Sequence, residues 1–358
     1  MPNADARLAL LTDWLVRDLH LAVARIEPAS SDASFRRYFR VYHPGGTLVV
    51  MDAPPPHEDV RPYLKVSALL EALGAHVPRV HEADATRGLL LLEDLGGTQY
   101  LARLEAGSDP EPLYRDALEV LADIQAQGGE AAAQLPPYDR VALRRELDLL
   151  PEWFLMRHLE LELPAAEREL LERTFELLIA EGLAQPQVFV HRDYHSRNLM
   201  VLTERNPGVL DFQDALRGPL GYDLVSLLKD CYIRWPRARV LGWVRAHHEL
   251  LAVRGFEPGP QAELVRGFDL IGVQRHLKVL GIFARLNYRD GKPGYLRDLP
   301  LTLRYVLETC ALYPGLAELG QFLERRAAPR LAAANARALE AAQVGRRAAS
   351  PGRGEPRA

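Results

Sequence analysis

Three oxygen-bearing side chains are spaced along one segment of the chain as phosphoryl transfer requires. Asp193 follows the apolar stretch 188–190, Asn198 comes five residues later, and Asp211 follows the apolar pair 209–210. Asp193 can accept the proton of an attacking hydroxyl, and the oxygens of Asn198 and Asp211 suit Mg²⁺ held against nucleotide phosphates. We therefore expect Asp193 to be catalytic and the other two residues to be metal ligands.

Hairpins and short apolar strands are predicted to position these groups. Residues 199–202 and 209–212 form a hairpin, turned by Arg205-Asn206-Pro207-Gly208. A second hairpin pairs residues 35–42 with 47–51, and Leu89 to Leu92 form a buried strand. An amphipathic helix is expected at 6–24, another at about 60–73, and an extended piece at 77–81.

Helical periodicity dominates after about residue 111, which predicts an α+β fold with two lobes. The first lobe, residues 1–95, is small and β-rich, and the second, residues 96–326, is mostly helical. Residues 327–358 form an Ala/Arg-rich tail that we expect to be a frayed helix followed by disorder. The expected helices of the second lobe are 111–127, 140–160, 164–182, 222–232, 236–253, 260–288 and 300–326.

The pattern His191-x-Asp193-x-x-x-x-Asn198, followed by Asp211-Phe212, resembles the catalytic loop and metal-binding aspartate of protein kinases and aminoglycoside phosphotransferases. The second histidine, His195, favours the phosphotransferase branch. This resemblance implies a bilobal kinase-like fold with ATP and Mg²⁺ as cofactors. It also implies that adenine lies on a hinge formed by the backbone carbonyl of Glu93 and the backbone amide of Leu95, although a plain connector between lobes is the alternative.

The nucleotide phosphates need cationic or N–H partners, and here the sequence departs from the kinase pattern. The loop from Ser31 to Ser34 has no glycine, and Met51 stands where a phosphate-pairing lysine is expected. Ser31, Ser34, Arg36 and Lys65 are the predicted nucleotide contacts. Arg37 and Arg40 are further candidates, and a contact between Lys65 and Asp52 would be a charge-swapped form of the missing pair.

Basic residues late in the chain are candidates for the acceptor site. Arg275 and Lys278 are three residues apart, so they share one face of the expected helix 260–288, and Arg289 follows its end. These residues, with His195, would suit an anionic or polyhydroxyl acceptor. A solvated helix face explains the pattern at least as well.

A closer resemblance, over roughly residues 25–300, is to the bacterial N-acetylmuramate/N-acetylglucosamine anomeric kinases of cell-wall recycling. It is carried by segments 31–38, 50–55, 91–96, 210–215 and 274–290. The resemblance implies an amino sugar that is phosphorylated at its anomeric hydroxyl, and it accounts for the missing lysine. The alternatives are a kinase of an aminoglycoside, choline, homoserine or another sugar, and a nucleotide-binding pseudokinase.

Composition limits the partners of this 358-residue chain. A formal net charge of −4 offers no broad basic surface, so a nucleic-acid partner is not expected. Apolar runs are too short to span a bilayer, and Asp5, Asp13 and Asp18 interrupt a possible signal peptide. We therefore expect a cytoplasmic protein with a small sugar as its partner. Cys231 and Cys310 lack metal or redox spacing and are expected to be buried thiols.

Overall fold

The computed structural model describes residues 5–31 and 35–349, which pack as two compact units. The first unit contains the chain up to residue 136, with segments 189–216 and 246–257, and the second contains 137–188, 217–245 and the chain from 258. Strands β6 (Gln187–Val190) and β9 (Leu216–Pro219) and helix α9 (Arg237–Val253) each have residues in both. The predicted lobe boundary after residue 95 stays a prediction.

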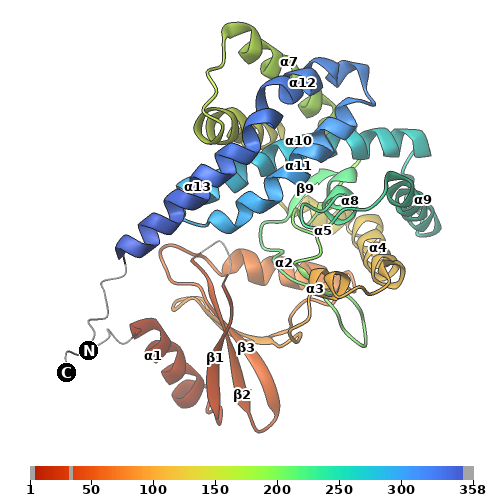
Figure 1. Ribbon diagram of the computed structural model, residues 1–358. Coiled ribbons are helices and arrows are strands. Elements are labelled where there is room, and N and C mark those ends of the chain that lie inside the picture. The colour runs from red at the N-terminus through yellow and green to blue at the C-terminus, as the bar shows by residue number, and fades with distance from the viewer. Residues whose placement is uncertain (1–4, 32–34, 350–358) are drawn as a thin grey trace, which may run out of the picture. The chain divides into compact units, whose positions relative to one another are not determined.

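A five-stranded antiparallel sheet is the framework of the first unit, in the order β1-β2-β3-β5-β4 (Figure 1). The predicted hairpin is confirmed as β2 and β3, whose register runs from Arg37 opposite Asp52 to His43 opposite Gly46. The edge strand β1 was not predicted from the sequence. The strand bounds are β1 Arg25–Ser31, β2 Arg37–His43, β3 Gly46–Asp52, β4 Val80–Asp84 and β5 Leu89–Glu93.

Helix α1 (Ala6–Asp13) covers one face of this sheet and continues as a π-helical turn, η1 (Trp14–Asp18). The Asp5 carboxylate caps the helix by accepting the backbone N–H groups of Arg7 and Leu8, donors that would otherwise lack a partner. The buried side chains of this interface come from the helix, its π-helical turn and alternate positions of the strands; they are Leu11, Trp14, Leu15, Phe39, Val41, Val50, Leu89 and Leu91. Fully burying each large side chain contributes about 1.5–3 kcal/mol.

Besides α1, the sheet and its parts of β6, β9 and α9, the first unit holds one short hairpin and a set of helices. That hairpin, predicted from the sequence, pairs β7 (Leu199–Met200) with β8 (Gly208–Val209). It is shorter than predicted, because only Leu199 opposite Val209 and Met200 opposite Gly208 are in register. The helices are α2 Arg61–Ala72, α3 Tyr100–Glu105, α4 Pro110–Gln127 and α5 Gly129–Ala133.

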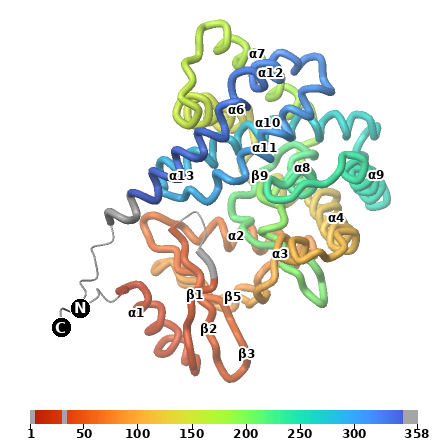
Figure 2. The backbone as a smooth tube through the Cα atoms, viewed as in Figure 1, coloured from red at the N-terminus to blue at the C-terminus, as the bar shows by residue number. Residues whose placement is uncertain are grey.

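The second unit is built around helix α10 (Gln261–Tyr288), which is buried along most of its length. It packs against α7, α8 and α11, and Figures 1 and 2 show α10 and α11 side by side. The remaining elements are α6 Arg140–Leu147, η2 Leu150–His158, α7 Ala165–Ala184, α8 Gly221–Leu228, η3 Pro293–Asp298, α11 Leu299–Cys310, η4 Pro314–Leu316, α12 Ala317–Phe322, η5 Leu323–Ala327 and α13 Ala328–Ala349. None of the helices described is both long and apolar enough to cross a membrane.

The Ala/Arg-rich tail is helical from Ala328 to Ala349, and residues 350–358 lie outside the described part of the chain. Leu331, Ala334 and Ala338 are buried along one side of this helix. Its Asn335 donates to the Leu296 carbonyl at 2.9 Å, and its Oδ1 lies 2.8 Å from Nε2 of His158. The first part of the tail is therefore packed against the second unit rather than frayed.

Candidate active site

The predicted catalytic loop, residues 191–198, is folded by hydrogen bonds among its own members. The Asp193 carbonyl accepts both the His195 backbone N–H and the Asn198 side-chain Nδ2, each at 3.0 Å. The Asn198 backbone N–H donates in turn to the His195 carbonyl at 2.8 Å. Because the nitrogen of the Asn198 amide is used in this way, its oxygen is the atom that can face a cation.

Buried aromatic residues anchor the loop within the first unit. The Tyr194 hydroxyl donates to the Ala117 carbonyl of α4 at 2.9 Å, and the Tyr194 ring meets that of His191 edge-on. The Asp193 backbone N–H donates to Nδ1 of His191 at 3.3 Å. Burial lowers the pKa of His191 to about 4, so this ring is neutral at pH 7 and its Nδ1 can accept the hydrogen bond from Asp193. His191 therefore orients the backbone at Asp193.

Asp211 lies beside the loop because the hairpin that follows returns the chain to Asn198. The Leu210 backbone N–H donates to the Asn198 carbonyl at 2.9 Å, and the Asn198 Nδ2 is 3.4 Å from Oδ2 of Asp211. The other oxygen, Oδ1, accepts Nε2 of Gln213 at 2.8 Å and lies 3.6 Å from Nη2 of Arg36. Gln213 was not predicted as a site residue, and its place two residues after Asp211 is the signal that could have indicated it.

Backbone strain marks both ends of this arrangement. Arg192 has φ 79° and Asp211 has φ 63°, both in the left-handed region that side chains other than glycine rarely adopt. Such conformations cost on the order of 1–3 kcal/mol each and persist where the surrounding structure enforces them. Arg192 precedes the predicted base Asp193, and Asp211 is itself a predicted metal ligand. Strain of this kind is typical of sites at which side chains must be held in exact positions.

The donors at this position fit a magnesium ion. Carboxylate oxygens of Asp211 and the amide oxygen of Asn198 are hard ligands, and the two side chains are in contact. Within residues 5–31 and 35–349, no cluster of three or more His, Cys, Asp or Glu side chains could hold a metal. The carboxylate of Asp211 beside the amide of Asn198 suits Mg²⁺, which proteins bind through one or two carboxylates together with substrate phosphates.

The predicted nucleotide-contacting residues of the first unit have different partners. The side chain of Ser31 and all of Ser34 lie outside the described residues. Lys65 donates from Nζ to the Gln134 carbonyl at 2.5 Å, while Arg36 is paired with Asp211. Their contacts with phosphate stay predictions.

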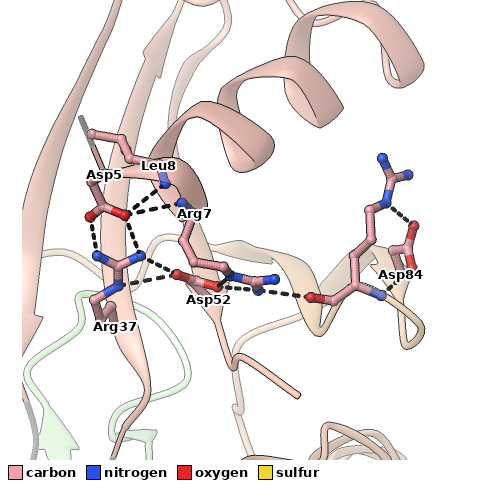
Figure 3. A network of polar contacts seen from close by, with 7 residues as sticks. Asp5, Arg7, Leu8, Arg37, Asp52 and Asp84 are labelled. Carbon is pink, nitrogen blue, oxygen red and sulfur yellow. Dashed lines mark hydrogen bonds and ion pairs between the residues drawn. The ribbon is translucent and has the colours of Figure 1, made fainter. Parts of the chain in front are cut away.

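The suggested contact between Lys65 and Asp52 is wrong. Figure 3 shows Asp52, at the end of β3, between Arg37 of β2 and Arg7 of α1. Arg37 also binds Asp5, the cap of α1, and Arg7 reaches the Arg87 carbonyl at 2.7 Å. The Asp52 side chain is fully buried, so two guanidinium partners are needed to compensate for its lost hydration. This network ties α1 to the sheet.

The predicted adenine hinge follows β5 and is held by side chains on both sides. Arg40 of β2 binds both carboxylate oxygens of Asp94, at 2.6 and 2.9 Å, and also donates to the Gly96 carbonyl. The Glu93 carboxylate accepts the Arg79 backbone N–H at 3.2 Å and lies 3.2 Å from Nε2 of His76. Leu95 is buried. These contacts fix the backbone of Glu93 and Leu95, whose contact with adenine stays a prediction.

The predicted acceptor residues of α10 are buried in the second unit. Nζ of Lys278 lies 3.1 Å from Oε1 of Glu146 and donates to the Tyr222 hydroxyl at 3.0 Å. Nη1 of Arg275 lies 3.6 Å from the Cys231 sulfur. The alternative of a solvated helix face is therefore wrong, since both side chains are buried.

Glu146, the partner of Lys278, was missed because it lies on α6, far away in the sequence. Its other oxygen accepts the Tyr138 hydroxyl, and Nε2 of Gln274 lies 3.3 Å away. Arg289 differs from the other α10 candidates, because it is exposed and pairs with its neighbour Asp290 at 2.8 Å. His195 is buried within the catalytic loop. The substrate role of these residues stays a prediction.

Comparison with known proteins finds relatives that match most of the chain. An N-acetylmuramate/N-acetylglucosamine kinase of Pseudomonas aeruginosa is 49% identical over 330 residues, covering 89% of this chain and 96% of the relative. A Pseudomonas putida protein of the same name is 45% identical, covering 90% and 97%. A GDP complex of aminoglycoside 2′-phosphotransferase-IIIa shares the fold, with a TM-score of 0.56 at 16% identity, covering 86% of this chain and 99% of that one.

These likenesses confirm the predicted α+β, kinase-like fold class and the predicted small-molecule phosphotransferase activity. The model of the phosphotransferase enzyme family matches residues 25–259, a range that holds the catalytic loop, Asp211 and the five-stranded sheet. The chain therefore belongs to the phosphotransferase enzyme family.

Proposed function

We propose that this protein transfers the γ-phosphoryl group of ATP to the anomeric hydroxyl of N-acetylmuramate or N-acetylglucosamine, giving the sugar 1-phosphate. The main support is the catalytic loop together with Asp211: the Asn198 side chain contacts both the Asp193 carbonyl and the Asp211 carboxylate. The names of the two Pseudomonas relatives, which match nearly their whole length, support the choice of sugar.

In this proposal Asp193 accepts the proton of the sugar hydroxyl. Its carbonyl is held by His195 and Asn198 and its backbone N–H by His191, so the loop places the carboxylate without help from the substrate. Asn198 and Asp211 would hold Mg²⁺, which neutralises charge on the transferring phosphoryl group. The backbone of Glu93 and Leu95 would hold the adenine.

The anomeric position suits this arrangement chemically. An anomeric hydroxyl is more acidic than an ordinary alcohol, so a carboxylate of modest basicity such as Asp193 faces an easier proton transfer. The transition state of phosphoryl transfer is loose and needs little activation of the nucleophile. Positioning and charge neutralisation therefore supply most of the rate.

The proposal is tested by giving the protein each free sugar beside its 1-O-methyl glycoside, with ATP and Mg²⁺. We expect only the free sugars to react, and phosphorus NMR should show a phosphate bonded to the anomeric carbon. Equal consumption of the methyl glycosides, or phosphate at the 6-position, would show that another hydroxyl is the acceptor. A matched panel of aminoglycosides, choline and homoserine tests the alternative acceptors.

A further inference from the structure

Strand β3 lacks the lysine that the kinase pattern places there, and the strand register shows which neighbouring residues share the face of its substitute, Met51. In β2 and β3, Phe39, Val41 and Val50 face α1. Side chains alternate along a strand, so Met51 and its partner Tyr38 face the opposite side of the sheet. Arg36 comes two residues before Tyr38, so the same alternation places it on the face of Met51.

Three of the four basic candidates are committed to other partners. Arg37 is on the α1 face, where it binds Asp5 and Asp52. Arg40 binds both oxygens of Asp94, and Lys65 donates to the Gln134 carbonyl. These contacts stabilise α1, the hinge and the end of α5.

Arg36 instead reaches the predicted metal ligand. Its side chain is only 13% exposed, and Nη2 lies 3.6 Å from Oδ1 of Asp211. Beside this pair, Tyr63 of α2 packs against Phe212, the residue after Asp211, with ring centroids 4.7 Å apart. Burial raises the pKa of Tyr63 well above its usual value, and the charges of Arg36 and Asp211 both act on its hydroxyl.

The ion pair between Arg36 and Asp211 is weak enough for Arg36 to leave Asp211 and pair with another anion. At 3.6 Å it is longer than a hydrogen bond, and the same Asp211 oxygen already accepts Gln213 at 2.8 Å. A guanidinium pairs strongly and bidentately with phosphate oxygens. A cation bound by Asp211 would repel Arg36, while nucleotide phosphates would attract it.

We propose that Arg36 replaces the missing strand lysine: it neutralises Asp211 before the nucleotide binds and pairs with the phosphates afterwards. The positive charge that the kinase pattern places on β3 would then come from Arg36, the residue before β2, on the same face of the sheet. This inference rests on the proposed function only in requiring that a nucleotide binds, and it holds whichever hydroxyl is phosphorylated.

The test is equilibrium binding of ATP, ADP and adenosine by calorimetry, with and without Mg²⁺, to the wild-type chain and to Arg36→Met. We expect the Kd for ATP and for ADP to rise about 10-fold or more, since one charge-assisted contact with phosphate is lost. The Kd for adenosine should stay within about 2-fold, because the base and ribose are bound elsewhere. Arg36→Lys, which keeps the charge, should recover part of the affinity.

Two matched variants separate this residue from its neighbours. Lys65→Met removes the other predicted cation, and Arg25→Met removes an exposed arginine of the same sheet that pairs with Glu27. Arg25→Met should bind ATP within about 2-fold of wild type, and Lys65→Met should lose less affinity than Arg36→Met. If Arg36→Met does not fold, Arg36→Gln, which keeps hydrogen-bonding groups without the charge, carries the same expectation.

Unchanged ATP affinity in a folded Arg36→Met variant, or a 10-fold loss in Lys65→Met instead, would overturn the assignment. An equal loss for adenosine would also overturn it, because a general distortion of the site would then be the cause. Failure of the proposed function looks different: the wild-type chain would bind ATP but transfer no phosphate to either amino sugar.

Discussion

The catalytic loop and helix α10 both hold polar residues that the sequence suggested as site residues, yet they use them differently. In the loop, Asp193, His195 and Asn198 contact one another within a few residues. On α10, Lys278 is neutralised by Glu146, which comes from a distant helix. Spacing along the chain predicts which side chains meet when their contacts are local. Whether a charged side chain is exposed or paired in the interior depends on residues from distant segments, which spacing does not reveal.

The largest effect should come from the loop. Asp193→Asn removes the proton acceptor but keeps the size of the side chain and leaves the backbone contacts with His195 and Asn198. We expect kcat to fall about 10²- to 10⁴-fold, the usual contribution of a general base. The Kd for ATP should stay within about 3-fold, measured by calorimetry.

The matched control for this variant is Asp59→Asn, which removes an exposed carboxylate of the same unit that pairs with Arg61. It should leave kcat and the unfolding midpoint as in the wild-type chain. Near-normal turnover by Asp193→Asn would refute the assignment of the base. A lowered unfolding midpoint would instead make the loop's role structural.

The next largest effect should come from α10 and concern stability rather than turnover. Lys278→Met leaves the buried Glu146 carboxylate without its cation, and breaking one side of a buried pair costs about 3–5 kcal/mol in the free energy of unfolding. Replacing both residues, as Lys278→Met with Glu146→Leu, should cost less than the sum of the single changes. Urea denaturation of the four proteins measures this coupling.

The predicted contact of Lys278 with the acceptor would gain support if Lys278→Met unfolded at the wild-type urea concentration while the KM for the sugars rose. That result would mean that Glu146 does not need its cation in the folded protein. The catalytic loop and α10 would then both serve the reaction, and α10 would not serve stability alone.

Much of the fold could be predicted because its elements carry local signals. The β2–β3 hairpin has its turn residues between two alternating stretches, and the Leu stripe of α1 has helical spacing. Strand β1 was missed because Pro28 and the polar residues around it resemble a loop, and an edge strand tolerates both. The tail was expected to fray, yet its buried Ala334 and Ala338 show that small side chains can pack closely.

The candidate site was predictable where its residues lie close together in the sequence. Asp193, Asn198 and Asp211 were predicted from their spacing, and the structure brings Asn198 into contact with the other two. Separating Arg37 from Arg36 and Arg40 required the strand register, which decides the face of the sheet on which each side chain lies. Lys65 lies on α2, and its contact with the Gln134 carbonyl could not be predicted from the sequence. The partners of Asp52 were unpredictable because Arg7 reaches it from another element.

The smallest effect should come from Arg289, the exposed member of the acceptor candidates. Arg289 pairs with the adjacent Asp290, and exposed pairs of this kind contribute about 0–1 kcal/mol, so Arg289→Ala should leave the unfolding midpoint unchanged. N-acetylmuramate carries a lactyl carboxylate that N-acetylglucosamine lacks. If Arg289 meets that carboxylate, KM should rise up to about 10-fold for the first sugar and stay constant for the second.

Arg297→Ala is the matched control, because Arg297 is also exposed and lies beside an aspartate, Asp298, at 3.7 Å. It should leave both KM values as in wild type. An equal rise for both sugars in Arg289→Ala would indicate contact with a group they share, and no change would remove Arg289 from the acceptor site. Either result would show that Arg289 does not recognise the lactyl carboxylate, and would sharpen the contrast between the end of α10 and the catalytic loop.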